Sequence, residues 1–371
     1  MKWNWQLPNW PKFIYHAKSV TALEKKFLLG AGGGLAILKT LDEDKRKQFA
    51  IEILCTEGQK SSEIEGEMLE RESLQSSICR HFGLVVKGKI SRKERGMGDL
   101  LWSVYTTYDH KLTHKMLFEW HRMLVDGDSR ISDIGKYRTH TDPMQIVSGR
   151  YDKHQIFFEA PPSDAVYEEM NRFIQWFNDS RNEEPILVRA AIAHIYFESI
   201  HPFEDGNGRI GRVLVEKALS QGLGNPTLFA VSEGVVRRKK EYYAALASCN
   251  RTLKIQNWIQ FFAEVILESQ KESLSLIRFL IGKSKLMNRL KGQINLRQEK
   301  VLLRIFAEGL KGFSGGLSAE NYIKITKTSR ATATRDLNDL VERKALYKTG
   351  ELKHTRYWLN MRDDPDSDYL H

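Results

Sequence analysis

The chain has 371 residues, a formal net charge of +10 and a hydrophobic content of 41%, which allow two or three domains with a substantial core. Its three cysteines lie far apart and form no CxxC pair, so the composition excludes a disulfide framework and a cysteine zinc site. The sequence has neither a signal-peptide core nor a stretch long enough to span a membrane, which predicts a cytoplasmic protein with no membrane partner.

The N-terminal region, residues 1–95, combines a tryptophan-rich lead with helical patterns. Three tryptophans before residue 11 are expected to bury large areas and to hold this segment against the core or against a second subunit. Further along, the polar run SSEIEGE spaces Ser61 and Glu65 four residues apart, so that the two side chains share one face of a helix. Such a run is also typical of an ordinary polar helix surface.

A β-hairpin is predicted between residues 145 and 164. Two β-prone patches flank a polar turn there, and two prolines close the segment. Because side chains of a strand alternate between its faces, one of Phe157 and Phe158 should point into the core. The apolar helical pattern that follows contains His194, which we interpret as a packed core histidine.

Residues 201–212, which read HPFEDGNGRIGR, hold most of the chemistry that the sequence offers. His201 can act as a general base, because an imidazole titrates near neutral pH and can accept a proton from an attacking hydroxyl. Asp205 supplies a hard oxygen ligand suited to Mg2+, which commonly binds through one or two carboxylates together with substrate phosphates. The segment therefore pairs a base with a metal site.

The glycines and arginines of the same segment are suited to bind a polyphosphate. Gly206 and Gly208 permit backbone conformations in which N–H groups around Asn207 converge on phosphate oxygens. A helix beginning at about Gly208 would reinforce this anion site with its positive N-terminus. Arg209 and Arg212 add fixed charge and forked donors that match phosphate. A GNG sequence by itself indicates only a turn.

A later pattern, KKEYYAALASCN, puts Tyr242, Tyr243 and Asn250 on one helix and its end. Aromatic pairs at helical spacing are typical of core packing, so the residues alone leave open whether the tyrosines bind a ligand. Asn250 is the stronger candidate for a ligand contact.

Basic charge is concentrated in the C-terminal part of the chain. Residues 271–360 carry 19 Lys or Arg against 8 Asp or Glu, whereas residues 361–371 form an acidic tail. Three helical patterns followed by two strand patterns predict a winged helix-turn-helix, with Ser329 capping the third helix. Basic faces are often merely solvated, and winged helices also serve as dimerisation or partner-docking modules. If this domain binds DNA, the groove-facing residues are Arg330, Thr332, Thr334 and Arg335.

The sequence resembles the Fic (filamentation induced by cAMP) family at its signature HxFx(D/E)GNGRxxR. The matching residues are His201, Phe203, Asp205, Gly206, Asn207, Gly208, Arg209 and Arg212. The resemblance implies transfer of AMP from ATP to a Ser, Thr or Tyr hydroxyl of a protein, with release of pyrophosphate. It assigns the base to His201, Mg2+ to Asp205 and an inward-packed anchor to Phe203. Its implied ATP contacts are Glu65, His201, Gly206, Asn207, Gly208, Arg209, Ile210, Gly211, Arg212, Tyr242, Tyr243 and Asn250.

Two further features acquire roles through the same resemblance. Ser61, Glu65 and Gly66 match the family's inhibitory pattern (S/T)xxxE(G/N), which implies that Glu65 pairs with Arg212 and occupies the place of the ATP γ-phosphate. The predicted hairpin resembles the family's flap, to whose free edge a target peptide can add as a strand. A homodimer is a further family-level expectation. The candidate flap residues are Ile156, Phe157, Phe158 and Glu159.

We therefore predict a mainly α-helical protein: a Fic helical core with a β-hairpin flap, plus a C-terminal winged helix-turn-helix domain. The expected domains are an N-terminal helical region at 1–95, the Fic core at 96–270, the winged helix at 271–360 and the acidic tail at 361–371. The predicted function is Mg2+-dependent adenylylation of proteins, including self-modification, restrained by Glu65. Three alternatives stay open: transfer of another phosphate-containing group such as phosphocholine or UMP, removal of AMP, and a DNA-binding regulator with an autoregulatory Fic core.

Overall fold

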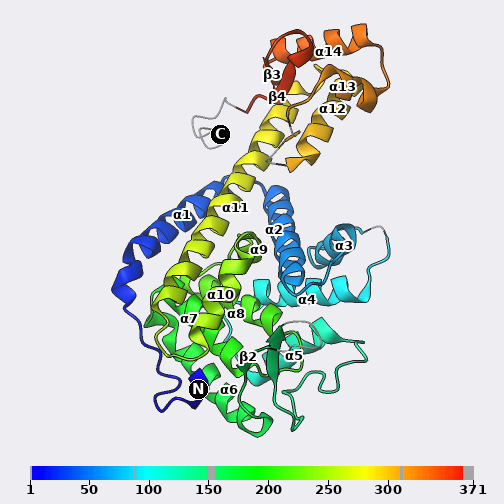
Figure 1. Ribbon diagram of the computed structural model, residues 1–371. Coiled ribbons are helices and arrows are strands. Elements are labelled where there is room, and N and C mark those ends of the chain that lie inside the picture. Colours follow the sequence, from blue (N-terminus) through cyan, green and yellow to red (C-terminus); the bar gives the residue numbers. More distant parts are fainter. Residues whose placement is uncertain (1, 87, 149–154, 310–311, 314, 362–371) are drawn as a thin grey trace. The chain divides into compact units, whose positions relative to one another are not determined.

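The computed structural model describes residues 2–86, 88–148, 155–309, 312–313 and 315–361 (Figure 1). The described chain is mainly α-helical, as the sequence predicted, and it divides into two compact units, residues 1–273 and 274–371. Of the predicted acidic tail, only Met361 lies within the described residues. Among those residues, no helix combines the length and the apolar character needed to cross a membrane.

Helices make up most of the first unit, and an antiparallel hairpin accompanies them. In chain order the elements are α1 (Thr21–Lys39), α2 (Glu43–Ile64), α3 (Arg71–His81), α4 (Arg92–Thr107), α5 (His114–Val125), β1 (Gln145–Ser148), β2 (Gln155–Glu159), α6 (Ser163–Asp179), α7 (Ile186–Ile200), α8 (Asn207–Leu223), α9 (Val231–Arg237), α10 (Lys239–Cys249) and the first part of α11 (Gln256–Leu290).

The centre of the first unit is the packed pair α7 and α8 (Figure 1). Nearly every residue of α7 is buried, because the helix is apolar around its whole circumference. The indole of Trp258 on α11 donates to the Ala191 carbonyl of α7, and His194 stacks on Phe262 in the same core. This packing confirms His194 as a core residue, and it fixes both ends of the loop that joins α7 to α8.

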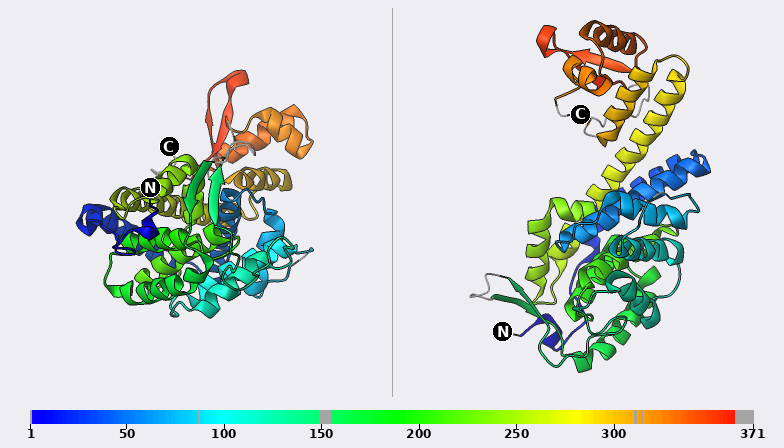
Figure 2. Two further views of the ribbon diagram at one scale, coloured as in Figure 1. Left: turned by 60° about the horizontal axis from the view of Figure 1, so that its bottom comes forward. Right: turned by 90° about the vertical axis from the view of Figure 1, so that its right-hand side faces the viewer.

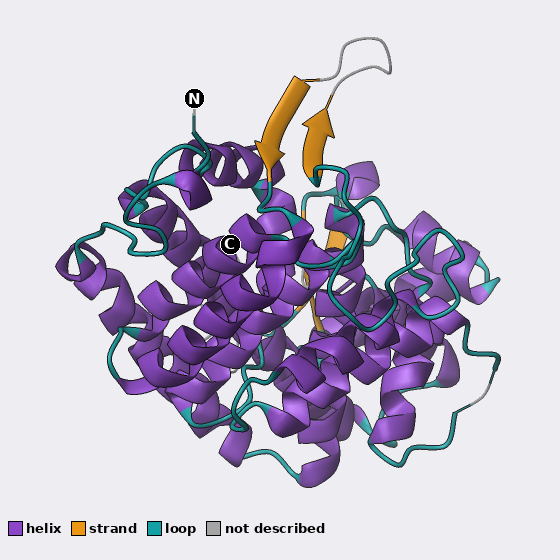
Figure 3. Cartoon of the chain, turned by 90° about the horizontal axis from the view of Figure 1, so that it is seen from below, coloured by secondary structure: helices purple, strands orange, loops and turns teal. Residues whose placement is uncertain are grey.

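The predicted hairpin is present, and it projects from the helices (Figures 2 and 3). Its turn, residues 149–154, lies outside the described residues. Phe158 is buried against Trp3, with ring centroids 5.4 Å apart, whereas Ile156 and Phe157 are exposed. One of the two phenylalanines therefore points inward, as the sequence predicted. The indole of Trp5 also donates to the Glu159 carbonyl, so the N-terminal lead packs on the second strand of the hairpin, as its tryptophans suggested.

Among its described residues, the second unit has three short α-helices, one 3-10 helix and a two-stranded sheet after the end of α11. Its elements are α12 (Leu296–Ala307), α13 (Ala319–Thr326), α14 (Arg330–Glu342), β3 (Leu346–Thr349) and β4 (Arg356–Leu359). Ser329 caps α14 by accepting a hydrogen bond from the Thr332 N–H, as predicted. These elements follow the predicted order, and their assignment as a winged helix stays a prediction.

Candidate active site

The turn after α7 holds His201 in an uncommon backbone conformation. His201 ends α7 with φ 50° and ψ 60°, the left-handed region that residues other than glycine rarely adopt. Buried Arg138 supports this turn, because its Nε donates to the His201 carbonyl at 2.9 Å. The same guanidinium donates to Ser163 Oγ at 2.9 Å and to the Pro161 carbonyl at the exit of the hairpin. Arg138 therefore connects the hairpin to His201, a role that sequence reasoning missed.

Two residues of the motif close the loop between α7 and α8. Phe203 is fully buried and stacks on His121 at 4.2 Å, which confirms that it packs inward. Asn207 accepts from the Phe203 N–H at 2.9 Å and donates to the Phe203 carbonyl at 2.8 Å, so its side chain stabilises the loop itself. Gly206 has φ 82°, which glycine tolerates, and α8 begins at Asn207, one residue before the predicted start.

Asp205 lies at the open side of this loop. Its side chain is 52% exposed, and Oδ1 lies 3.5 Å from an Arg209 guanidinium nitrogen. Within the described residues, no three His, Cys, Asp or Glu side chains cluster as a metal site. A single accessible carboxylate fits Mg2+, which needs few protein ligands and takes its others from water and substrate phosphates.

The C-terminal end of α2 places two acidic residues, Glu65 and Glu67, beside the start of α8. α2 ends at Ile64, and Gly66 follows with φ 81°. The Gly66 N–H donates to the Glu63 carbonyl and the Glu67 N–H to the Ser62 carbonyl, which is the Schellman pattern of helix termination. Glu65 is therefore the capping residue that follows α2. The sequence had suggested instead that it lies on the helix together with Ser61.

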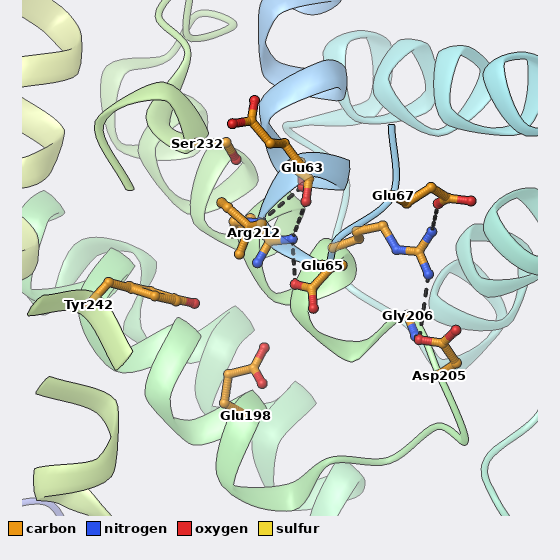
Figure 4. Close-up of polar contacts among 12 residues, drawn as sticks. Glu63, Glu65, Glu67, Glu198, Asp205, Gly206, Arg212, Ser232 and Tyr242 are labelled. Atoms are coloured by element: carbon orange, nitrogen blue, oxygen red, sulfur yellow. Dashed lines mark hydrogen bonds and ion pairs between the residues drawn. The ribbon is translucent and has the colours of Figure 1, made fainter. Parts of the chain in front are cut away.

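Both arginines of the motif are paired with this helix end (Figure 4). Arg212, with a side chain only 1% exposed, lies 2.8 Å from Glu65 Oε1. It also donates to the Ser61 Oγ at 3.0 Å and to the Ser61 carbonyl at 2.8 Å. Arg209 donates to Glu67 at 2.7 Å, a contact that the sequence pattern did not indicate.

The Glu65 carboxylate also covers the first turn of α8. A Cβ atom added at Gly208 would collide with Glu65 Oε1, so only glycine leaves room for the carboxylate there. Lys239 donates to the Ile64 carbonyl at 2.8 Å and Tyr243 donates to it at 3.2 Å, so α10 stabilises the end of α2. The contacts fix Glu65 against the helix N-terminus that was predicted to bind phosphate.

Burial changes the charge state of the titratable groups at the end of α7. Burial, with a contribution from Arg138, lowers the pKa of His201 to about 4, so the imidazole is neutral near pH 7. Burial and the negative charge of Glu65 raise the pKa of Glu198 to about 8. Glu198 was not singled out from the sequence, although a carboxylate inside an apolar helix, three residues before His201, was a visible signal.

The ATP contacts predicted on α10 and at its end point to different parts of this structure. Tyr242 is buried, and its hydroxyl lies 2.7 Å from His194 Nε2 in the core. Tyr243 bonds the end of α2, and Asn250 donates to the Phe157 carbonyl of the hairpin at 3.0 Å. Of the two small motif residues, Ile210 is fully buried, and Gly211 packs against Glu198 and His194. Their roles in ATP binding stay predictions.

Comparison with known proteins identifies two regions of the chain. Residues 111–219 match the model of the Fic/DOC family, and residues 3–84 match DUF4172, a domain of unknown function. A protein adenylyltransferase of Caenorhabditis briggsae is 29% identical over 185 residues, covering 47% of this chain and 33% of the relative. A probable protein adenylyltransferase of Aquifex aeolicus is 37% identical over 92 residues, covering 24% and 25%. The chain thus spans a third or less of these curated relatives.

Solved structures with similar folds are also Fic proteins. A Fic family protein from Desulfovibrio desulfuricans superposes with a TM-score of 0.53 at 21% identity, covering 91% of this chain and 96% of that one. A Fic domain containing signaling protein from Bacteroides thetaiotaomicron gives a TM-score of 0.51 at 22% identity, covering 67% and 95%. At these identities the likeness shows the fold alone.

Proposed function

We propose that this chain, whose residues 111–219 match the model of the Fic/DOC family, transfers AMP from ATP to Ser, Thr or Tyr hydroxyls of proteins, itself included. We propose further that Glu65 restrains this reaction. The observation that supports both statements most strongly is the 2.8 Å ion pair between Glu65 and Arg212, one turn into α8 from the His201 loop. Similarity to proteins named protein adenylyltransferases supports the choice of AMP as the transferred group.

The residues of the loop have complementary parts in the proposed reaction. His201 accepts the proton of the target hydroxyl, whose oxygen bonds to the α-phosphorus of ATP while the bond to the β-phosphate oxygen breaks. Arg209 and Arg212 stabilise the negative charge on the departing pyrophosphate. Asp205 is the residue that would hold Mg2+, and the ion supplies further neutralisation of the phosphate charge.

The proposed restraint acts on both arginines at once. Arg212 is paired with Glu65 and Arg209 with Glu67, so neither guanidinium is available to the phosphates in this state. The Glu65 carboxylate also puts negative charge at the N-terminus of α8, where the phosphates of ATP are expected. A productive nucleotide must therefore displace Glu65, which requires movement at the end of α2.

The hairpin is the proposed docking edge for the target segment, which would add as a strand. Two carbonyls of β2 are already occupied, because Phe157 accepts from Asn250 and Glu159 accepts from Trp5. A target strand that pairs with this edge has to replace those two donors. The exposed side chains of Ile156 and Phe157 offer apolar contacts beside it.

The transferred group is tested with differently labelled nucleotides and the variant Glu65→Gly. We expect covalent label on the protein from ATP labelled at the α-phosphate and none from ATP labelled at the γ-phosphate. Label from the γ-phosphate alone would contradict AMP transfer. Label from UTP or from a phosphocholine donor in its place would favour transfer of another group, and release of AMP from modified protein would favour an AMP-removing enzyme.

For the second unit we infer DNA binding as a separate function. The first turns of α14 expose Arg330, Thr334 and Arg335, while Thr332 is half-buried, and the segment 271–360 carries an excess of 11 basic residues. Arg330→Ala and Arg335→Ala should each reduce the slope of log affinity against log salt by about one if these side chains bind phosphates. Unchanged slopes, or no binding to duplex DNA, would exclude this interface. The expected homodimer is tested separately, by sedimentation.

A further inference from the structure

A buried carboxyl group lies directly behind the proposed base. Glu198 is on the last turn of α7, three residues before His201, which caps the helix in the left-handed region. Glu198 Oε2 lies 3.7 Å from His201 Nδ1. Both Glu198 Oε1 and His201 Nδ1 are buried, and neither has a hydrogen-bond partner among the described residues. Two unsatisfied polar groups that face each other at this distance need a physical explanation.

The geometry also explains why this carboxyl group cannot move away. A Cβ atom added at Gly211 would lie 2.6 Å from Glu198 Oε1, so the carboxyl group is packed against the backbone of α8. In Figure 4 its carboxylate points in the direction of Glu65, which is paired with Arg212. Glu198 is therefore confined between α8, His201 and the residues of the proposed restraint.

A base with a pKa near 4 accepts a proton poorly at neutral pH, so His201 needs support during the reaction. When a carboxylate faces Nδ1, it fixes the ring orientation and stabilises the imidazolium that forms when Nε2 takes a proton. Glu198 is well situated for this task, because Nδ1 is the nitrogen turned toward it. Nε2 then remains for the target hydroxyl.

We propose that Glu198 is a positioning residue for His201: it orients the imidazole through Nδ1 and balances the charge that the ring gains. The proposal rests on the proposed function, since it concerns the same proton transfer. The target oxygen bonds to the α-phosphorus, pyrophosphate leaves with the electron pair of the broken bond, and the hydroxyl proton goes to Nε2 of His201. The Glu198 carboxylate gains no bond and acts through Nδ1.

The restraint by Glu65 and the support that Glu198 gives to His201 are coupled through charge. The groups that act on Glu198 are Glu65 and Arg212. Those that act on His201 are Arg138, the backbone of Glu198, Glu65 and Asp205. While Glu65 stays on Arg212, its negative charge opposes ionisation of Glu198. Departure of Glu65 removes that opposition and leaves Arg212 to favour the Glu198 carboxylate. Release of Glu65 therefore frees a phosphate-binding arginine and activates the base together.

The first test measures the pKa of His201 directly. NMR of ring-labelled histidine compares the single variant Glu65→Gly with the double variant that carries both Glu65→Gly and Glu198→Gln. The variant His201→Ala identifies the His201 signal. In Glu65→Gly the charge that opposes ionisation of Glu198 is gone, and the amide keeps the shape of Glu198 but cannot ionise, so the pKa of His201 should fall. Glu169→Gln, on α6, serves as the matched control for a carboxyl-to-amide change and should leave it unaltered. An unchanged His201 pKa in the Glu198→Gln variant overturns the proposal.

The second test measures transfer kinetics in the same variants. Glu198→Gln should lower kcat by about tenfold or more while the KM for ATP changes by less than about twofold, because the residue acts on the base and not on the nucleotide. A kcat equal to that of the parent overturns the proposal. If Glu65→Gly itself transfers no group, the proposed function fails, and the His201 pKa comparison still decides the role of Glu198.

Discussion

Replacing Glu65 by glutamine tests how strongly the restraint depends on charge. Arg212 is almost fully buried, and its partners are Glu65 Oε1 and the carbonyl and hydroxyl of Ser61. Glutamine keeps the shape of Glu65 and removes its negative charge. A buried guanidinium then keeps its two contacts to Ser61 and loses the negatively charged partner that Figure 4 shows beside it.

The expected loss of stability in Glu65→Gln follows from the exposure of the two side chains in the ion pair. Removing one partner of a fully buried ion pair costs about 3–5 kcal/mol, whereas an exposed pair contributes about 0–1 kcal/mol. Glu65 is 32% exposed and Arg212 only 1%, and Ser61 still satisfies part of the guanidinium. We therefore expect the free energy of unfolding to fall by about 1–3 kcal/mol, between those limits.

Thermal unfolding followed by tryptophan fluorescence is a suitable assay, because seven of the eight tryptophans precede residue 274 and report on the first unit. In Glu65→Gln, ATP with Mg2+ should raise Tm more than it does in the natural protein, because Arg212 is free to bind the γ-phosphate. A ligand at one hundred times its Kd adds about 2.7 kcal/mol of stability. AMP, which lacks the β- and γ-phosphates, should restore much less.

The control is Glu63→Gln, two residues before Glu65 in the last turn of α2, where the side chain pairs with Lys60. This change should alter stability by less than about 0.5 kcal/mol and leave the response to ATP unchanged. Equal stability of Glu65→Gln and the natural protein would refute the reasoning. So would equal stabilisation of Glu65→Gln by ATP and AMP, since Arg212 would then not contact the γ-phosphate.

Four further outcomes are expected. Asp205→Ala should abolish the stimulation of transfer by Mg2+, and metal-stimulated transfer that persists in a Mg2+ titration would indicate another ligand. Glu67→Gln frees Arg209 and should tighten ATP binding by about two- to fivefold in calorimetry; unchanged affinity would show that this pair does not compete with the nucleotide. Arg138→Lys removes the forked hydrogen bonds of the guanidinium in the core and should lower the free energy of unfolding, measured in urea, by about 2–4 kcal/mol. A free energy of unfolding equal to that of the natural protein within error would contradict a supporting role for Arg138. Folding raises the pKa of Glu198 from its ordinary value of 4.5 to about 8, so the free energy of unfolding of the natural protein should fall as the pH rises from the lower to the higher value. Urea titrations of Glu198→Gln should show no such fall. Parallel pH profiles for the two proteins would contradict a buried carboxyl group at this position.

Local patterns in the sequence predicted a large part of the fold and the composition of the loop. The hairpin follows from two β-prone patches around a polar turn, strand alternation indicates that one of Phe157 and Phe158 is buried, and the inward packing of Phe203 was implied by the family signature. Ser329 was recognisable as a cap because capping depends on a side chain and the next few residues. The helix that bears Ser61 was also expected, but its end was not, because Gly66 was read only as part of a signature and not as the left-handed residue that terminates α2.

Residues that act over long sequence distances could not be predicted in the same way. Arg138 reaches a carbonyl 63 positions away, and Glu67 reaches Arg209 across 142 positions. An isolated charged residue gives no periodic signal, so its partner is known only once the chain is folded. Tyr242 shows the opposite difficulty: a family resemblance implied a ligand contact, and the hydroxyl lies against His194 in the core of this state.

The central claim is best tested by self-modification with ATP labelled at the α-phosphate, in the natural protein, Glu65→Gly, and Glu65→Gly with His201→Ala. The account predicts little label on the natural protein, strong label on Glu65→Gly, and none on the double variant, because Glu65 restrains the reaction and His201 is its base. Label that is equal in the natural protein and Glu65→Gly would contradict the restraint. Label that persists in the double variant, or is absent from all three although ATP binds, would contradict His201-dependent AMP transfer.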